Sequence, residues 1–243
     1  MNTDLNAMTI NGVSTASPED RRGVILDGVP TDLLDSMTVY KTLTPNLDAD
    51  TIGGAIDLET ISAFSYGSNF VKFKAETSRN DLTKDSSNPK LSGTYTTVIP
   101  QENGDLGIAF VISSQERRIK AENNETGGWG STYVDDDYEM RYYDLTRERD
   151  GIVLNLDYVS NSGSKTYLHL FHNEYEDVEY RAKWEVRDVM EEYTPTISGT
   201  VATYGASRMD TEGKNRTEIR SIDNLAIGPV SYTHLTLPTS RSV

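Results

Sequence analysis

The sequence contains no cysteine among its 243 residues. Disulfides, thiolate metal sites and cysteine nucleophiles are therefore excluded. It also lacks an excess of positive charge, because 23 Lys and Arg stand against 38 Asp and Glu, a formal net charge of −15. Such a charge repels a phosphate backbone, so we expect no nucleic-acid partner. No apolar run reaches the length of a membrane-spanning helix. The length of apolar runs does not reveal the strands of a transmembrane β-barrel, because their apolar and polar residues alternate.

The sequence also lacks the common enzyme signatures. No G-x-S-x-G, Walker A or G-x-G-x-x-G run is present, and GSKT at 163–166 lacks the P-loop spacing. Glu174, Glu176 and Glu179 could be considered as paired carboxylates of a secreted hydrolase. Polar alternation along a strand produces such pairs routinely. We therefore expect no catalytic residue, no cofactor and no enzymatic activity.

Two histidines and an acidic run are the candidate metal ligands. His169 and His172 are three positions apart, and in a strand such residues point to opposite faces, so they cannot share one ion. The run Asp135–Asp137 lacks the spacing of a calcium loop and fits an acidic external loop equally well. The sequence predicts no metal site.

Residues 1–62 combine short strands with helical turns, which is typical of a small α/β unit. AMTINGV (7–13) predicts a strand that runs into a turn at Asn11-Gly12. PTDLLDSM (30–37) predicts a short helix, because Pro suits a first helical turn and Asp an N-terminus. MTVYKT and GGAIDLET predict two further strands.

From about residue 66 the pattern changes to long alternating strands separated by polar turns. Leu106, Ile108, Phe110 and Ile112 share one apolar face, for example. Residues 118–143, rich in Gly and Asp, predict a long loop. The predicted strands lie at 69–79, 90–99, 105–117, 144–160, 164–186, 195–208 and 216–228.

Long meandering strands with short turns on one side and long loops on the other are typical of an outer-membrane barrel. A soluble β-sandwich is the alternative, but its strands typically run only about 5–6 residues. We therefore predict a mainly β chain: a partial antiparallel transmembrane β-barrel preceded by a small α/β unit.

The order of two motifs in the first unit resembles the plug domain of TonB-dependent receptors. VPTDLLDSMTVYKT (29–42) is similar to the family's helix followed by a strand that ends in Lys or Arg. IGGAIDLET (52–60) is similar to the Gly-Gly-apolar-Ile segment that closes the plug before the first barrel strand. The resemblance assigns 1–62 to the C-terminal half of the plug and 63–229 to the first barrel strands.

The resemblance implies energy-coupled uptake of a scarce ligand, such as a siderophore, cobalamin or an oligosaccharide, across the outer membrane of a Gram-negative bacterium. The implied partners are the inner-membrane TonB complex, acting through an N-terminal box, the transported ligand and outer-membrane lipid. It also implies a barrel of about 22 strands, of which this chain would supply about seven. We expect a fragment, since no signal peptide, energy-coupling box or first plug half has a counterpart here.

The resemblance also suggests roles for individual residues. Gly53, Gly54 and Ile56 form the plug motif, in which the glycines let the last plug strand lie close to its neighbours. Arg21 and Arg22 are the candidate ligand-binding residues, because paired arginines suit an anionic ligand, although salt bridges to the barrel wall would also explain them. Five aromatic residues could be interface-girdle or sugar-stacking residues: Trp129, Tyr138, Tyr142, Tyr143 and Trp184.

The C-terminal segment 230–243 does not continue the strand pattern. VSYTHLTLPT (230–239), when back-translated, matches the read-through of a sequencing-library transposon adapter. We therefore expect a non-native tail. For the rest of the chain, a soluble β-rich adhesin or carbohydrate-binding module remains the alternative to the receptor.

Overall fold

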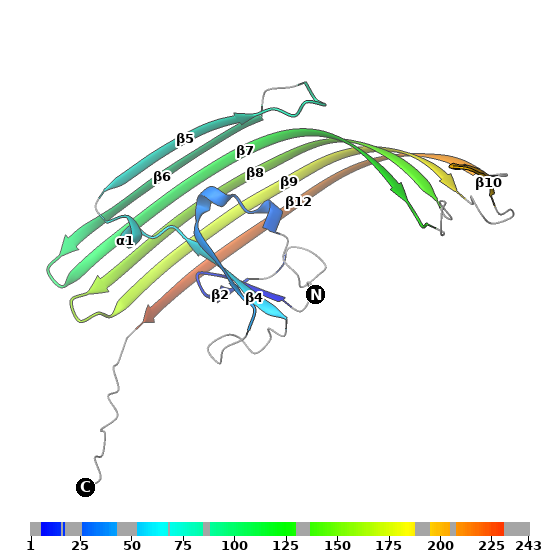
Figure 1. Cartoon of the computed structure of the whole chain (residues 1–243). Coiled ribbons are helices and arrows are strands. Elements are labelled where there is room, and N and C mark those ends of the chain that lie inside the picture. Colours follow the sequence, from blue (N-terminus) through cyan, green and yellow to red (C-terminus); the bar gives the residue numbers. More distant parts are fainter. Residues whose placement is uncertain are drawn as a thin grey trace, which may run out of the picture.

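The computed structural model describes residues 6–15, 17, 26–42, 53–67, 69–84, 88–129, 137–187, 195–204 and 208–230. Outside these ranges lie Arg21, Arg22, the segment 130–136 and the predicted tail after Val230. The described residues form two β-sheets stacked face to face, with one further short hairpin (Figure 1).

The larger sheet has six strands in the order β12-β9-β8-β7-β6-β5, all antiparallel. The predicted meander with sequential neighbours is confirmed; only the hairpin β10–β11 interrupts it, between β9 and β12. The strands are β5 (Phe70–Ser78), β6 (Asn88–Gln101), β7 (Gly104–Thr126), β8 (Tyr138–Ser160), β9 (Lys165–Arg187), β10 (Thr196–Ser198), β11 (Val201–Thr203) and β12 (Arg208–Val230).

The smaller sheet contains β1 (Asn6–Ile10), β2 (Val13–Ser14), β3 (Leu34–Tyr40) and β4 (Gly54–Thr60), in the order β2-β1-β4-β3. β1 and β4 are parallel, whereas the other two pairs are antiparallel. The 3-10 turns η2 (Leu26–Gly28) and η3 (Thr31–Leu33) precede β3, and helix α1 (Ala63–Tyr66) follows β4. This small sheet lies under the curved large sheet, on its concave face (Figure 1).

The hydrophobic core lies between the two sheets. From the small sheet and its flanking turns it takes Met8, Ile10, Val29, Leu33, Leu58, Ile61 and Ala63. From the concave face of the large sheet it takes Ala109, Val111, Val153, Phe171 and Ile222. Burial of these side chains fixes the position of the small sheet against β7, β8, β9 and β12.

Apart from the core residues, the large sheet buries polar side chains on its concave face, and it exposes many apolar side chains on its convex face. The exposed convex residues include Phe73, Tyr95, Phe110, Ile112, Ile152, Leu170, Leu225 and Ile227. The buried concave residues include Thr94, Thr96, Ser113, Asn155, Asp157, Asn173 and Asp177. This distribution is the reverse of that in a water-soluble sheet with one covered face.

Three predictions of secondary structure were wrong. The helix expected at 30–37 is only the turn η3, because β3 already begins at Leu34 and pairs with β4. The loop expected at 118–143 is shorter, since β7 and β8 stay paired from Gly104↔Ser160 to Thr126↔Tyr138. The strand expected at 195–208 is the separate hairpin β10–β11.

The described strands do not close into a barrel. β5 and β12 are the two ends of the six-stranded sheet, and each has one neighbouring strand within the described part of the chain. The mainly β, antiparallel character is thus established, whereas the barrel remains a prediction. No helix in the described ranges is both long and apolar enough to cross a bilayer.

Candidate functional site

Three side chains on the concave face hold the small sheet and its turns by backbone carbonyls. Asn155 on β8 donates from Nδ2 to Ile61 O (2.9 Å) and to Thr60 Oγ1 (2.6 Å). Asn173 on β9 donates to Gly28 O (3.1 Å), and Arg149 Nε on β8 donates to Asp27 O (2.6 Å). We call these contacts the seat. They satisfy carbonyl groups that would otherwise be buried without partners.

Tyr175 lies at the centre of the seat and is almost fully buried. Its cross-strand partners are Arg149 on β8 and Arg220 on β12, so the three side chains form one row. Both guanidinium groups lie over the Tyr175 ring, at 5.1 Å and 5.3 Å from its centroid. These cation–π contacts stabilise two positive groups close to one buried ring beneath η2.

Close backbone contacts complete the seat. An added Cβ at Gly151 on β8 would lie 2.4 Å from Leu33 Cδ1, and one at Gly107 on β7 would lie 2.6 Å from Phe64 Cε2. Leu33 and Phe64 therefore pack directly on strand backbone that lacks side chains. Glycine inside a strand often marks such a close approach.

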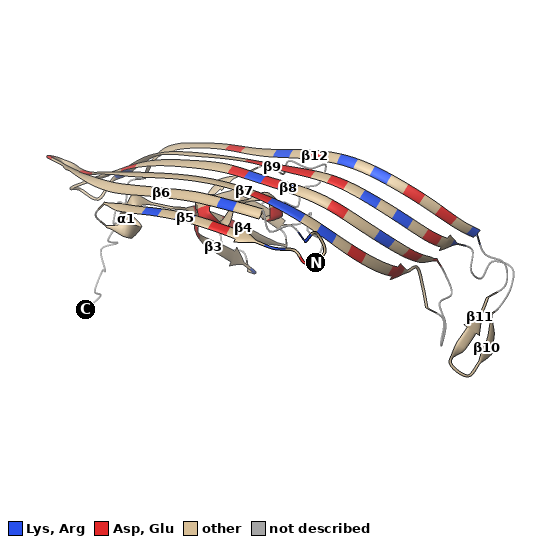
Figure 2. Ribbon diagram, turned by 90° about the horizontal axis from the view of Figure 1, so that it is seen from above, with Lys and Arg blue, Asp and Glu red and all other residues tan. Residues whose placement is uncertain are grey.

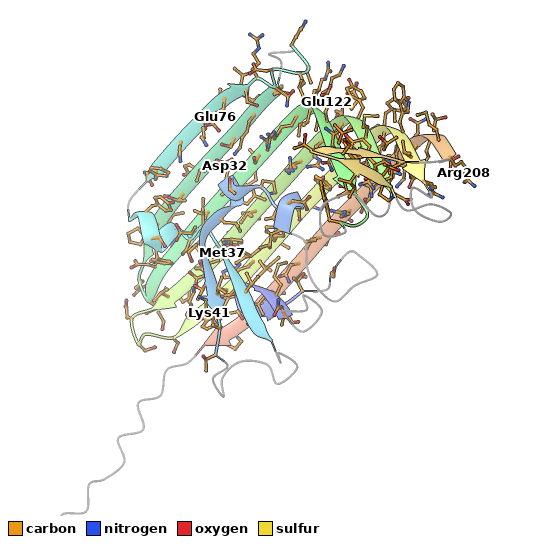
Figure 3. All side chains as sticks on the ribbon, turned by 45° about the vertical axis from the view of Figure 1, so that its right-hand side comes forward. Asp32, Met37, Lys41, Glu76, Glu122 and Arg208 are labelled. Carbon is orange, nitrogen blue, oxygen red and sulfur yellow. The ribbon has the colours of Figure 1, made fainter. Side chains whose placement is uncertain are left out.

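An ion-pair cluster joins the small unit to the edge of the large sheet. Asp32, in η3, pairs with Lys90 on β6 and with Lys74 on β5, the latter at 3.5 Å between Nζ and Oδ1 (Figure 3). Lys74 also pairs with Glu76 at 2.8 Å. Polar contacts thus surround the apolar core on several sides.

A cleft of about 500 Å³ opens between the small sheet and β8–β9, at the end where the strand turns are short. Asp157 forms its buried wall and accepts contacts from His169 Nε2 (2.9 Å), Lys165 Nζ (3.1 Å) and Ser62 Oγ (3.4 Å). Asp57 and Glu59 of β4 line the opposite side. The cleft is polar and holds both charge signs.

Beyond the small sheet, the concave face is a ladder of charged rows that cross β7, β8, β9 and β12. Figure 2 shows the charged residues of both faces concentrated on the half of the strands toward β10 and β11. One row is wholly acidic: Glu125, Glu139, Glu185 and Asp210. Neighbouring rows supply the counterions, among them Arg141, Lys183, Arg187 and Arg208.

Glu185 is the most strongly held carboxylate of that row. Arg187 Nε and Lys183 Nζ each lie 2.8 Å from its Oε2. Their hydrogen bonds lower the pKa of Glu185 from 4.5 to about 2. The concave face therefore carries fixed, mutually compensated charges at neutral pH.

The predicted plug motif lies at the start of β4. Gly54 has φ +153°, and a Cβ there would approach Tyr40 O to 3.0 Å, which agrees with the close strand packing expected of it. Gly53 directly precedes the strand, and Ile56 packs against the core. Arg21 and Arg22 lie outside the described residues, so their predicted ligand contacts stay a prediction.

The structure separates the other candidates onto two faces. His169 on the concave face contacts Asp157, whereas His172 on the convex face contacts Asp223, as the strand period requires. Glu179 pairs with Arg216 on the concave face, opposite to the convex Glu174 and Glu176. Within the described residues, no group of three or more His, Cys, Asp or Glu is placed to hold a metal ion.

The aromatic candidates also divide. Tyr142 and Trp184 line a cleft on the convex face, together with Tyr180, which the sequence reasoning did not single out. Trp129 follows β7 and donates from Nε1 to Thr126 Oγ1 (2.8 Å). Of the acidic run, Asp137 is described, and its carbonyl accepts from Gly127 N (2.7 Å).

No protein-family model matches the chain, and no curated protein or solved structure is significantly similar to it.

Sequence reasoning missed the residues of the seat. A usable signal was present for two of them, because Gly107 and Gly151 interrupt strongly alternating strands. Asn155 and Asn173 gave a weaker signal. Each is an amide on the same strand face as a buried apolar residue two positions away, Val153 for Asn155 and Phe171 for Asn173.

Proposed function

We propose that this chain is part of a TonB-dependent outer-membrane receptor, in which the small sheet is the C-terminal half of the plug and the large sheet is part of the barrel wall. The receptor would import a siderophore, cobalamin or an oligosaccharide, driven by the inner-membrane TonB complex. The observation that carries the proposal is the reversed polarity of the large sheet, with an apolar convex face and a polar, covered concave face.

The dimensions of the convex face support a lipid contact. On β8 the convex apolar residues run from Ile152 to Tyr158, and neighbouring strands continue the band. At about 3.3 Å per residue this stretch is about 20 Å long, close to the ~25 Å apolar band of outer-membrane barrels. The strands continue far beyond it, toward the charged rows.

The seat supports a plug that can be displaced. Its hydrogen bonds and ion pairs can be replaced by water, whereas a wholly apolar interface of the same size would expose its full area on opening. A pull on the small sheet would therefore break the hydrogen bonds of Asn155, Asn173 and Arg149. Water can then bond to the groups that these hydrogen bonds leave free. This is the property that an energy-coupled gate requires.

A pair of neighbouring residues tests the orientation. Phe73 and Lys72 lie on opposite faces of β5, and both are exposed. Because the chain has no cysteine, Phe73→Cys and Lys72→Cys each give a single labelling site for a bimane fluorophore. In micelles of brominated dodecyl maltoside, we expect strong quenching at position 73 and weak quenching at position 72.

Equal quenching at the two positions would contradict a lipid-facing convex side. A chain that stays folded and monomeric in water without detergent would instead favour the soluble adhesin or carbohydrate-binding module.

A further inference from the structure

A second cleft, of about 440 Å³, lies on the convex face near the far end of the strands. We call it the Trp184 cleft. Trp184, Tyr180 and Met140 are 58%, 45% and 39% exposed there. Its remaining lining residues are Glu122, Asn124, Arg141, Tyr142 and Ala182. Exposed apolar patches with a polar rim commonly mark binding sites.

The register of the strands explains the hollow. Ala182 lies between Tyr180 and Trp184 on the same face of β9, and its cross-strand partner on β8 is Tyr142. On the other side its partner is Gly213 of β12, which has no side chain. The small side chain of Ala182 therefore forms a floor. It is bordered by the rings of Tyr142, Tyr180 and Trp184 and is open toward β12.

The Trp184 cleft does not belong to the apolar band. Tyr142 is ten positions before Ile152, where the band ends on β8, which corresponds to about 33 Å along the strand. Between them the convex face carries carboxylates in adjacent rows: Asp150 with Glu174, and Glu116 with Glu148 and Glu176. Lipid chains would not extend across these charges, so the aromatic rings face the aqueous medium.

The polar side chains at the rim on the convex face include one carboxylate and one amide, those of Glu122 and Asn124. Arg141 also lines the cleft, but its guanidinium lies on the concave face, where it pairs with Glu125 at 2.7 Å and with Glu139. No interaction of the Glu122 carboxylate or the Asn124 amide is found within the described residues, and Glu122 lies at the far end of the sheet (Figure 3). Lys120, beside Tyr142, is paired with Asp144 at 3.3 Å.

On these observations we propose that the Trp184 cleft binds one pyranose ring of a free, uncharged glycan. A pyranose has an apolar C–H face, which stacks on an indole or phenol ring, and an edge of hydroxyl groups that both donate and accept. The Glu122 carboxylate and the Asn124 amide at the rim match that edge. The site is on the convex face, opposite to the concave face that the proposed transport would use, so neither proposal depends on the other.

Trp184 can report its own occupancy. The chain has two tryptophans, so Trp129→Phe leaves Trp184 as the only indole. This variant of the full chain, in a polyoxyethylene detergent whose headgroup is not a sugar, is titrated with maltoheptaose, cellohexaose, xylohexaose and mannohexaose. We expect a saturable change in Trp184 emission with at least one of them, half-complete in the millimolar range. In the same background Tyr180→Ala should weaken binding about five-fold.

Ile219→Ala is the matched control, because Ile219 is an exposed convex residue of β12 outside the cleft, and it should leave the titration unchanged. The proposal is overturned if none of the four glycans gives a saturable response, or if Tyr180→Ala has no effect. A response to choline chloride alone would identify an organic-cation site instead. A response to rough lipopolysaccharide alone would overturn the free-glycan assignment.

Discussion

The contact between Gly151 and Leu33 offers a direct test of how the small sheet is held. In Gly151→Ala the new Cβ would lie 2.4 Å from Leu33 Cδ1 and 3.3 Å from Pro30 Cγ. Carbon atoms prefer about 3.5–4.0 Å, so the first contact must open by more than about 1 Å. Leu33 is fully buried, so a shift of its side chain must be accommodated within the packed core. Overpacking of this kind costs about 1–3 kcal/mol.

Hydrogen exchange of β4 measures that cost, because Gly54–Thr60 is the central strand that the seat holds in place. A loss of about 1–3 kcal/mol makes exchange through opening of the small sheet about 5- to 150-fold faster. Gly213→Ala is the control, since a Cβ at this position meets no atom within 4 Å. It should leave exchange in β4 unchanged.

A double-mutant cycle isolates the contact. Leu33→Ala alone removes a buried side chain and should cost about 2–5 kcal/mol. In that background, adding Gly151→Ala should cost little, because the clashing methyl group is gone. The explanation is refuted if Gly151→Ala leaves β4 exchange unchanged, or if its cost is the same with and without Leu33.

Three further outcomes are expected. Asn155→Leu removes the donor to Ile61 O and should cost about 1–3 kcal/mol, measured as faster proteolysis between β4 and α1. Glu185→Gln should lower the urea midpoint by a constant amount above pH 4.5. Because the folded pKa of Glu185 is depressed to about 2, that difference should shrink as the pH falls through about 2. The chain expressed alone with an export signal should show no ligand uptake and no heat-modifiable band, because within the described residues β5 and β12 each leave one sheet edge unpaired, which lipid cannot satisfy. Uptake by this chain would refute that reasoning.

The alternating segments of the sequence predicted the fold well where one face is apolar. Leu106, Ile108, Phe110 and Ile112 do share one face of β7, and the strand pairing follows chain order. The pattern could not tell whether that face is covered or exposed. Alternation shows that the two faces of a strand differ in polarity. It does not show which face is covered, because the segment that covers a face lies elsewhere in the chain.

The pattern failed where both faces of a strand are polar. Beyond Gln115, β7 carries Arg117 on one face and Arg118 on the other, so the apolar contrast disappears and a loop was predicted. Pairing with β8 continues there because cross-strand ion pairs such as Lys120–Asp144 replace apolar contacts. The Trp184 cleft lies in this stretch, so its hollow could not be predicted without the register.

The order of the elements along the chain has a consequence for folding. β1 to β4 precede the large sheet, yet Ile222 and Arg220 of β12, the last described strand, complete the core and the seat. The hairpins β6–β7 and β8–β9 close over short turns and can form early, whereas docking of the small sheet needs contacts across most of the chain. We therefore expect Met8, Ile10 and Leu58, which share one core with Ile222, to complete their packing only after β12 has paired with β9. Of the described elements, those synthesised first are thus expected to be the last to reach their final packing.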